Sequence, residues 1–104
     1  MGIDVAWVNE RHETKQAVFD SHQVISKLAT TTWPKLSNSF CLRFVDFAGD
    51  ATFNQAQIKI LVEELRSEAK KQNDLKFRGH LEKVIRLVER SIDEVHTYIK
   101  FSGD

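Results

Sequence analysis

The strongest pattern in the sequence is a helical repeat of apolar residues over its second half. From Ile58 to Ala69, apolar side chains recur at intervals of three and four residues, which is the spacing of one face of an amphipathic helix. This spacing predicts a helix over residues 54–72. After Asn73 and Asp74 the same spacing resumes, and it predicts a further, longer helix that returns antiparallel to the first of the pair.

The end of that longer helix can be read in two ways. Its apolar seam reaches Ile99, but residues 96–101 read HTYIKF, a composition rich in the β-branched and aromatic types that strands favour. Residues 96–101 can therefore form either the last segment of the helix or a short strand.

The first third of the chain predicts a hairpin followed by a helix. Apolar residues alternate over 3–9, the period of a strand with its odd positions in the core. Residues 16–19 return to apolar types and predict a second strand after a loop longer than two residues. A helix of about three turns is expected to begin at residues 20–21 and to end before Trp33 and Pro34, because the residue before a proline disfavours helical backbone.

Residues 40–46 carry a second alternating pattern. Phe40, Leu42 and Phe44 alternate with side chains that would face the other way, which predicts a strand at the centre of its sheet. The fold class that follows is α+β, with a small antiparallel sheet, made of the N-terminal hairpin and this strand, packed against about three helices. A length of 104 residues fits a single domain over 1–104.

Composition excludes several classes of protein. Fifteen Lys and Arg balance fifteen Asp and Glu, whereas a protein held to nucleic acid by phosphate neutralisation carries a basic excess. The single cysteine cannot form an intramolecular disulfide, and the charged first twenty residues do not resemble a signal peptide. No apolar run approaches the roughly 18 residues of a membrane span, so we expect a cytoplasmic protein without a membrane partner.

The zero net charge hides a segregation of charge along the chain. Residues 66–90 hold eight basic and four acidic residues, whereas 46–64 hold one basic and four acidic ones. The basic corner formed by 66–90 can steer an RNA, a phosphate or an acidic protein; the alternative is a solvated face with internal pairs such as Glu82 with Arg86. The interaction candidates in this corner are Arg66, Lys70, Lys71 and Arg78.

The most distinctive stretch is 42–57. It resembles the pattern L-R-F-(I/V)-D-x-x-G-D-x-x-F-N-x-x-Q of small uncharacterised bacterial proteins, a resemblance that implies no function. Asp46 and Asp50 can bind a divalent cation or act as an acid and base pair, with Asn54 as a further oxygen ligand. The structural alternative is that the two carboxylates belong to a turn and that Asn54 forms a capping box with Gln57.

Three aromatic residues lie at the ends of expected elements, where they can serve as anchors for a partner: Trp33, Phe47 and Phe53. Phe40 and Phe44 are instead expected in the core. Cys41, between them, reads as a buried apolar residue rather than a nucleophile.

The sequence contains no signature of catalysis or of a cofactor. No Walker loop, dinucleotide fingerprint or nucleophile elbow occurs, and no two histidines have the spacing of a helical zinc site. We therefore expect a non-catalytic, cytosolic protein-interaction module, of the immunity or regulatory type, that binds another protein. A small enzyme or metal-binding domain at Asp46 and Asp50, and RNA binding through 66–90, are the alternatives, and a homodimer follows if Ile85 and Leu87 are exposed.

Overall fold

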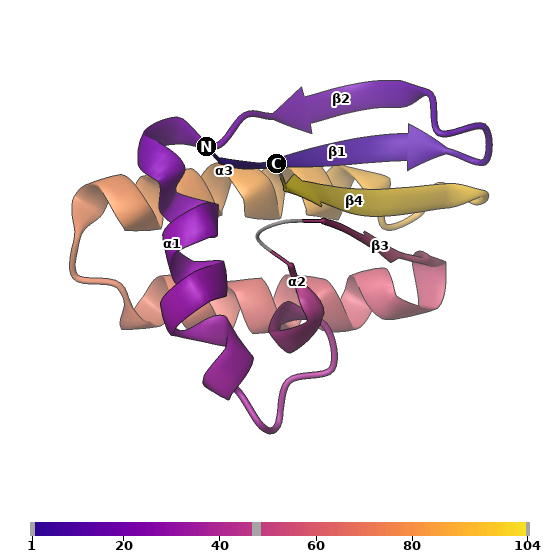
Figure 1. The fold of residues 1–104 in the computed structure, drawn as a ribbon. Coiled ribbons are helices and arrows are strands. Elements are labelled where there is room, and N and C mark those ends of the chain that lie inside the picture. Colours follow the sequence, from indigo (N-terminus) through magenta and orange to yellow (C-terminus); the bar gives the residue numbers. More distant parts are fainter. Residues whose placement is uncertain (1, 47–48, 104) are drawn as a thin grey trace.

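The computed structural model describes residues 2–46 and 49–103 and has an α+β architecture (Figure 1), which confirms the predicted fold class. The strands are β1 (Ile3–Asn9), β2 (Thr14–Val18), β3 (Asp50–Phe53) and β4 (Thr97–Gly103). The helices are α1 (Val24–Thr31), α2 (Gln55–Lys71) and α3 (Leu75–Ser91). Short 3-10 turns, η1 (Ser21–Gln23), η2 (Trp33–Lys35) and η3 (Leu42–Phe44), lie beside α1 and before β3.

The four strands form one antiparallel sheet in the order β2-β1-β4-β3. The longest ladder joins β1 to β4, from Ile3 opposite Gly103 to Asn9 opposite Thr97, so the two ends of the chain lie side by side (Figure 1). Alternate residues of both strands are buried. One face of the sheet therefore packs on the helices.

The helices form the second layer. Figure 1 shows α2 and α3 as an antiparallel pair, with α3 behind β1 and β4 and α2 below the strands in this view, and α1 crossing near the end where α2 passes into α3. Apolar residues of all three helices join those of β1, β3 and β4 in one buried cluster. The predicted capping box is confirmed, because the Asn54 side chain accepts from the Gln57 N–H and the Gln57 side chain accepts from the Asn54 N–H.

The predicted strand over 40–46 is wrong. Residues 42–44 form the single turn η3, and Phe40 and Phe44 are 69% and 59% exposed rather than in the core. Leu42 is fully buried. A strand requires neighbouring strands to accept its N–H groups, whereas here the side chain of Glu64 in α2 accepts those of residues 40–42.

The two readings of 96–101 are resolved in favour of the strand. Helix α3 ends at Ser91, so it has 17 residues, as α2 has, and the prediction of a longer second helix is wrong. Thr97–Gly103 is an inner strand that pairs with both β1 and β3. His96 has a left-handed backbone, φ 56°, which breaks any helical continuation between the two. As an inner strand, β4 forms backbone hydrogen bonds on both sides. More of its N–H and C=O groups therefore have partners than they would in one more helical turn at the protein surface.

The N-terminal elements are shorter or displaced relative to the prediction. The second strand is Thr14–Val18 rather than 16–19, and α1 has eight residues rather than three full turns. His22 and Gln23 both have φ 57°, so the backbone at 21–23 forms a tight turn before α1 begins.

Among the described residues, no helix is both long and apolar enough to cross a membrane.

Candidate functional site

Both candidate carboxylates lie at the protein surface. Asp46 and Asp50 are both exposed, the Gly49 N–H donates to the Asp46 carbonyl at 3.5 Å, and Asp50 Oδ2 lies 3.4 Å from Lys100 Nζ. Asn54 serves as the cap of α2. Over 2–46 and 49–103, no group of three His, Cys, Asp or Glu side chains is placed to hold a metal ion. The metal-ion or acid-base role of this turn stays a prediction.

Two of the three aromatic residues of the expected patch are buried. Trp33 is fully buried, and Phe53 is 4% exposed, with its ring 5.7 Å from that of Phe101 in an edge-to-face arrangement. Phe47 lies outside the described residues. Neither Trp33 nor Phe53 can therefore anchor a partner on the folded protein, because both side chains belong to the buried core cluster.

Arg66, Lys70 and Arg78, three of the four basic candidates, lie together between α2 and α3. Two adjoining depressions of about 300 and 280 Å³ lie between α2 and α3 and share Ala69, Lys70 and Glu82. We call them together the α2–α3 groove; its lining is Arg66, Ala69, Lys70, Arg78, Glu82, Ile85 and Arg86. Lys71 is elsewhere, because it pairs with Glu68 at 2.9 Å in a separate pocket.

The cations of the α2–α3 groove differ in how far they are neutralised. Arg66 pairs with both Glu63 and Glu89, and Arg78 donates through Nε to the Ala69 carbonyl at 3.4 Å. Within the described residues, no salt bridge involves Lys70 or Arg86. The groove therefore offers unneutralised positive charge above an apolar floor formed by Ala69 and Ile85.

Burial of the apolar seam of α3 removes the sequence-based argument for a homodimer. That argument required an exposed apolar seam on α3, yet Ile85 and Leu87 are 8% and 1% exposed in the single chain. Packing within the domain covers most of the seam, and the small exposed part of Ile85 lies in the α2–α3 groove.

A carboxylate that the sequence did not single out holds the loop before η3. The side chain of Glu64 accepts hydrogen bonds from the N–H groups of Phe40, Cys41 and Leu42, at 2.6, 3.1 and 3.0 Å, and from the Ser39 hydroxyl at 3.0 Å. Successive N–H groups aimed at one carboxylate form an anion-binding nest. Glu64 thus replaces the strand partners that residues 40–42 lack and fixes Phe40 at the surface.

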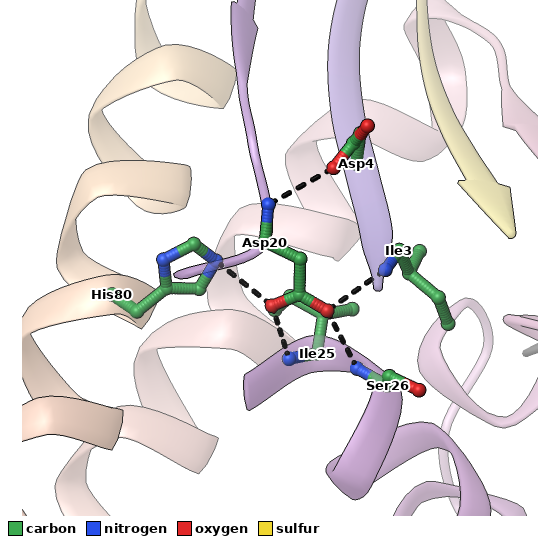
Figure 2. A network of polar contacts seen from close by, with 6 residues as sticks. All are labelled: Ile3, Asp4, Asp20, Ile25, Ser26 and His80. Carbon is green, nitrogen blue, oxygen red and sulfur yellow. Dashed lines mark hydrogen bonds and ion pairs between the residues drawn. The ribbon is translucent and has the colours of Figure 1, made fainter. Parts of the chain in front are cut away.

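A second carboxylate, with a buried side chain, joins the start of β1 to the start of α1. Asp20, whose side chain is 1% exposed, accepts from the N–H groups of Ile3, Ile25 and Ser26 at 2.8, 2.9 and 3.0 Å (Figure 2). Its own N–H donates to Asp4 at 2.9 Å. A Cβ on Gly2 would come within 2.6 Å of the Asp20 Cβ, so the close approach of the chain at this point requires glycine.

His80 of α3 faces this carboxylate. Its Nε2 lies 3.4 Å from Asp20 Oδ1 (Figure 2), yet neither ring nitrogen forms a hydrogen bond with a described residue. Burial lowers the pKa of His80 below its ordinary value of 6.5; the charge of Asp20 opposes this shift, and that of Lys83 adds to it. His80 is therefore a neutral core residue at neutral pH.

The lowered pKa of His80 predicts how stability depends on pH. The unfolded chain binds a proton near pH 6.5 and the folded chain only at lower pH, so the contribution is complete above 6.5 and is lost as the pH falls toward the folded pKa. We expect the free energy of unfolding to fall as the pH drops through this window, by at most about 1.4 kcal/mol per pH unit for one group. Urea denaturation of the wild type and His80→Gln between about pH 7.5 and 5.5 measures it.

Comparing His80→Gln with a control variant tests whether His80 causes this pH dependence. His80→Gln should be flatter with pH over this window than the wild type, whereas His12→Asn, at an exposed residue, should retain the wild-type slope. Equal slopes for the wild type and His80→Gln would contradict the assignment.

Cys41 does not have the environment of a reactive cysteine. It is fully buried, and its thiol lies 3.7 Å from the Gln57 carbonyl. Burial, with a contribution from the charge of Glu64, raises the pKa of the Cys41 thiol to about 12. The thiol is therefore protonated at neutral pH, which removes the thiolate that nucleophilic chemistry requires.

Comparisons with protein-family models, with curated proteins and with solved structures find no match to this chain.

Proposed function

We propose that this protein is a non-catalytic interaction module that binds an acidic segment of another protein in the α2–α3 groove. The observation that carries the proposal is the gathering of Arg66, Lys70, Arg78 and Arg86 around an apolar floor, with Glu82 as the acidic side chain of the described lining. Such a surface favours a partner that places carboxylates around an apolar side chain.

The charges of Lys70 and Arg86, which form no salt bridge within the described residues, give these two residues the largest share in steering. Charges that already pair within the domain, such as Arg66 with Glu89, offer less to a partner than free ones. A module of this type acts by covering a surface of its partner, which is the mode expected of an immunity or regulatory protein.

The test begins with selection of peptides from a random display library on the immobilised protein. The expected peptides are rich in Asp and Glu around a large apolar residue. In fluorescence anisotropy with a selected peptide, Lys70→Glu should weaken binding by about fivefold or more, and added salt should weaken it further.

The matched control is Arg11→Glu, which makes the same change of charge in the loop between β1 and β2. It should change the affinity by less than about twofold. Equal losses for the two variants, selection of neutral or basic peptides, or tighter binding of a single-stranded RNA than of the selected peptide would each overturn the proposal. Self-association of the protein through the groove, measured by sedimentation, would overturn it as well.

A further inference from the structure

The charges of the α2–α3 groove have a fixed order along its length. The two depressions share three residues, which mark the middle of the groove: Ala69, Lys70 and Glu82. Arg86 lines only one depression, and Arg78 lines only the other. The groove therefore has a cation toward each end, whereas its middle combines one cation with one carboxylate.

The carboxylate in the middle keeps its charge. Glu82 is exposed and lies one helical turn from both Arg78 and Arg86 on α3, yet within the described residues it forms no salt bridge. Its charge offsets the attraction of Lys70 for a further anion at this point. A ligand with carboxylates at both ends and none in the middle is therefore preferred to a uniformly acidic one.

The distance between the two end cations sets the spacing of the carboxylates. Arg78 and Arg86 are separated along the axis of α3 by about 12 Å, at a rise of about 1.5 Å per residue. In a bound helix, residues about seven positions apart lie on one side and are about 10 Å apart. In an extended segment, about four residues cover the same distance.

The backbone of the groove walls favours a helical ligand over an extended one. Residues 78–86 lie inside α3, where N–H and C=O groups bond to one another along the helix. On the α2 side, the Ala69 carbonyl already accepts from the Gln72 N–H at 3.2 Å and from Arg78 Nε at 3.4 Å. An extended segment would lose water from its own backbone groups here without gaining backbone partners, whereas a helix satisfies its own.

We infer that the acidic segment binds in the α2–α3 groove as an amphipathic helix. Two of its carboxylates, about two turns apart, lie toward Arg78 and Arg86, and an apolar side chain lies between them on Ala69 and Ile85. Glu82 selects against a carboxylate in the middle. This inference rests on the proposed function, because it gives the conformation and the order of charges of the segment proposed there.

The first test compares two capped peptides of identical composition, each about 16 residues long, with two glutamates and two leucines among alanine and glutamine. In one peptide the glutamates are seven positions apart and the leucines lie between them. In the other, one glutamate and one leucine are exchanged, so that the glutamates are four positions apart. We expect the wild type to bind the seven-position peptide about fivefold or more tightly in fluorescence anisotropy.

The conformation of the bound peptide is tested separately. A proline in the middle of the seven-position peptide should weaken binding by about tenfold or more, because proline breaks a helix. Transferred nuclear Overhauser effects of the bound seven-position peptide should include contacts between residues three positions apart, which a helix has and an extended chain lacks.

A charge reversal tests the role of Glu82. A third glutamate, in place of one central leucine of the seven-position peptide, should not tighten binding to the wild type. Glu82→Lys should bind this three-glutamate peptide about fivefold or more tightly than the two-glutamate one. The matched control is Glu94→Lys, the same change of charge at an exposed residue between α3 and β4, which should keep the wild-type order of the two peptides.

Lys70→Glu separates failure of this inference from failure of the proposed function. Absence of binding by every acidic peptide, or binding that Lys70→Glu leaves unchanged, would overturn both. Where binding does depend on Lys70, three results would overturn the inference alone: equal affinities for the two glutamate spacings, undiminished binding of the proline peptide, or the same order of the two- and three-glutamate peptides in the wild type and Glu82→Lys.

Discussion

Asp20→Ala is expected to lower the free energy of unfolding by about 3–5 kcal/mol, because it removes the shared acceptor of three N–H groups. Those donors belong to Ile3, Ile25 and Ser26, and without Asp20 they stay in a site that water reaches poorly. The loss combines the absent charged hydrogen bonds with the cost of buried donors left without partners. Urea denaturation followed by tryptophan fluorescence measures the change.

Two comparison variants test the loss of stability expected for Asp20→Ala, one conservative and one at an exposed aspartate. Asp20→Asn keeps one acceptor oxygen and should cost less than Asp20→Ala. Asp93→Ala, at an exposed position between α3 and β4, should change the free energy of unfolding by less than about 0.5 kcal/mol. A loss for Asp20→Ala no larger than that of Asp93→Ala would show that the carboxylate does not join β1 to α1.

Glu64→Gln is expected to lower the free energy of unfolding by about 2–3 kcal/mol. An amide has one acceptor oxygen and carries no charge, so it cannot hold all the donors of residues 39–42 that the carboxylate holds. Glu64→Gln should loosen the segment 40–42 in addition to lowering the stability of the whole fold. Hydrogen exchange at the amides of Phe40, Cys41 and Leu42 is expected to accelerate more than exchange in the β1–β4 ladder.

The neighbouring residue supplies the control. Glu63→Gln makes the same chemical change one position earlier, where the side chain is 73% exposed and pairs with Arg66. It should cost less than about 0.5 kcal/mol. Equal losses for Glu63→Gln and Glu64→Gln, or unchanged exchange at residues 40–42, would contradict the role of Glu64.

These two carboxylates explain where prediction from sequence failed. The alternation of Phe40, Leu42 and Phe44 has the period of a strand, but period alone does not say whether a neighbouring strand is present to accept the N–H groups. Glu64 lies more than twenty residues further along the chain, and nothing local marks it as the acceptor. Likewise, Asp20 is a plausible helix cap by residue type, but only the fold brings Ile3 and His80 to it.

The basic corner shows what composition predicts and what it leaves open. The excess of Lys and Arg over 66–90 is visible in the sequence, and three of its four candidates do line one groove. Which of them keep a free charge depends on contacts between helices, such as Arg66 with Glu89, and on Lys71 turning to Glu68. The aromatic candidates failed for the same reason, since burial of Trp33 and Phe53 depends on how the ends of the elements meet.

By itself, the sequence determined the features that depend on neighbours within one or two helical turns: the α2 and α3 helices, the Asn54–Gln57 capping box and the first strand. Only the tertiary structure decided the fate of 40–46, the choice of strand for 97–103 and the set of free charges in the α2–α3 groove. The physical reason is that a backbone N–H or a charged side chain must find a partner, and for these segments the partner is distant in sequence.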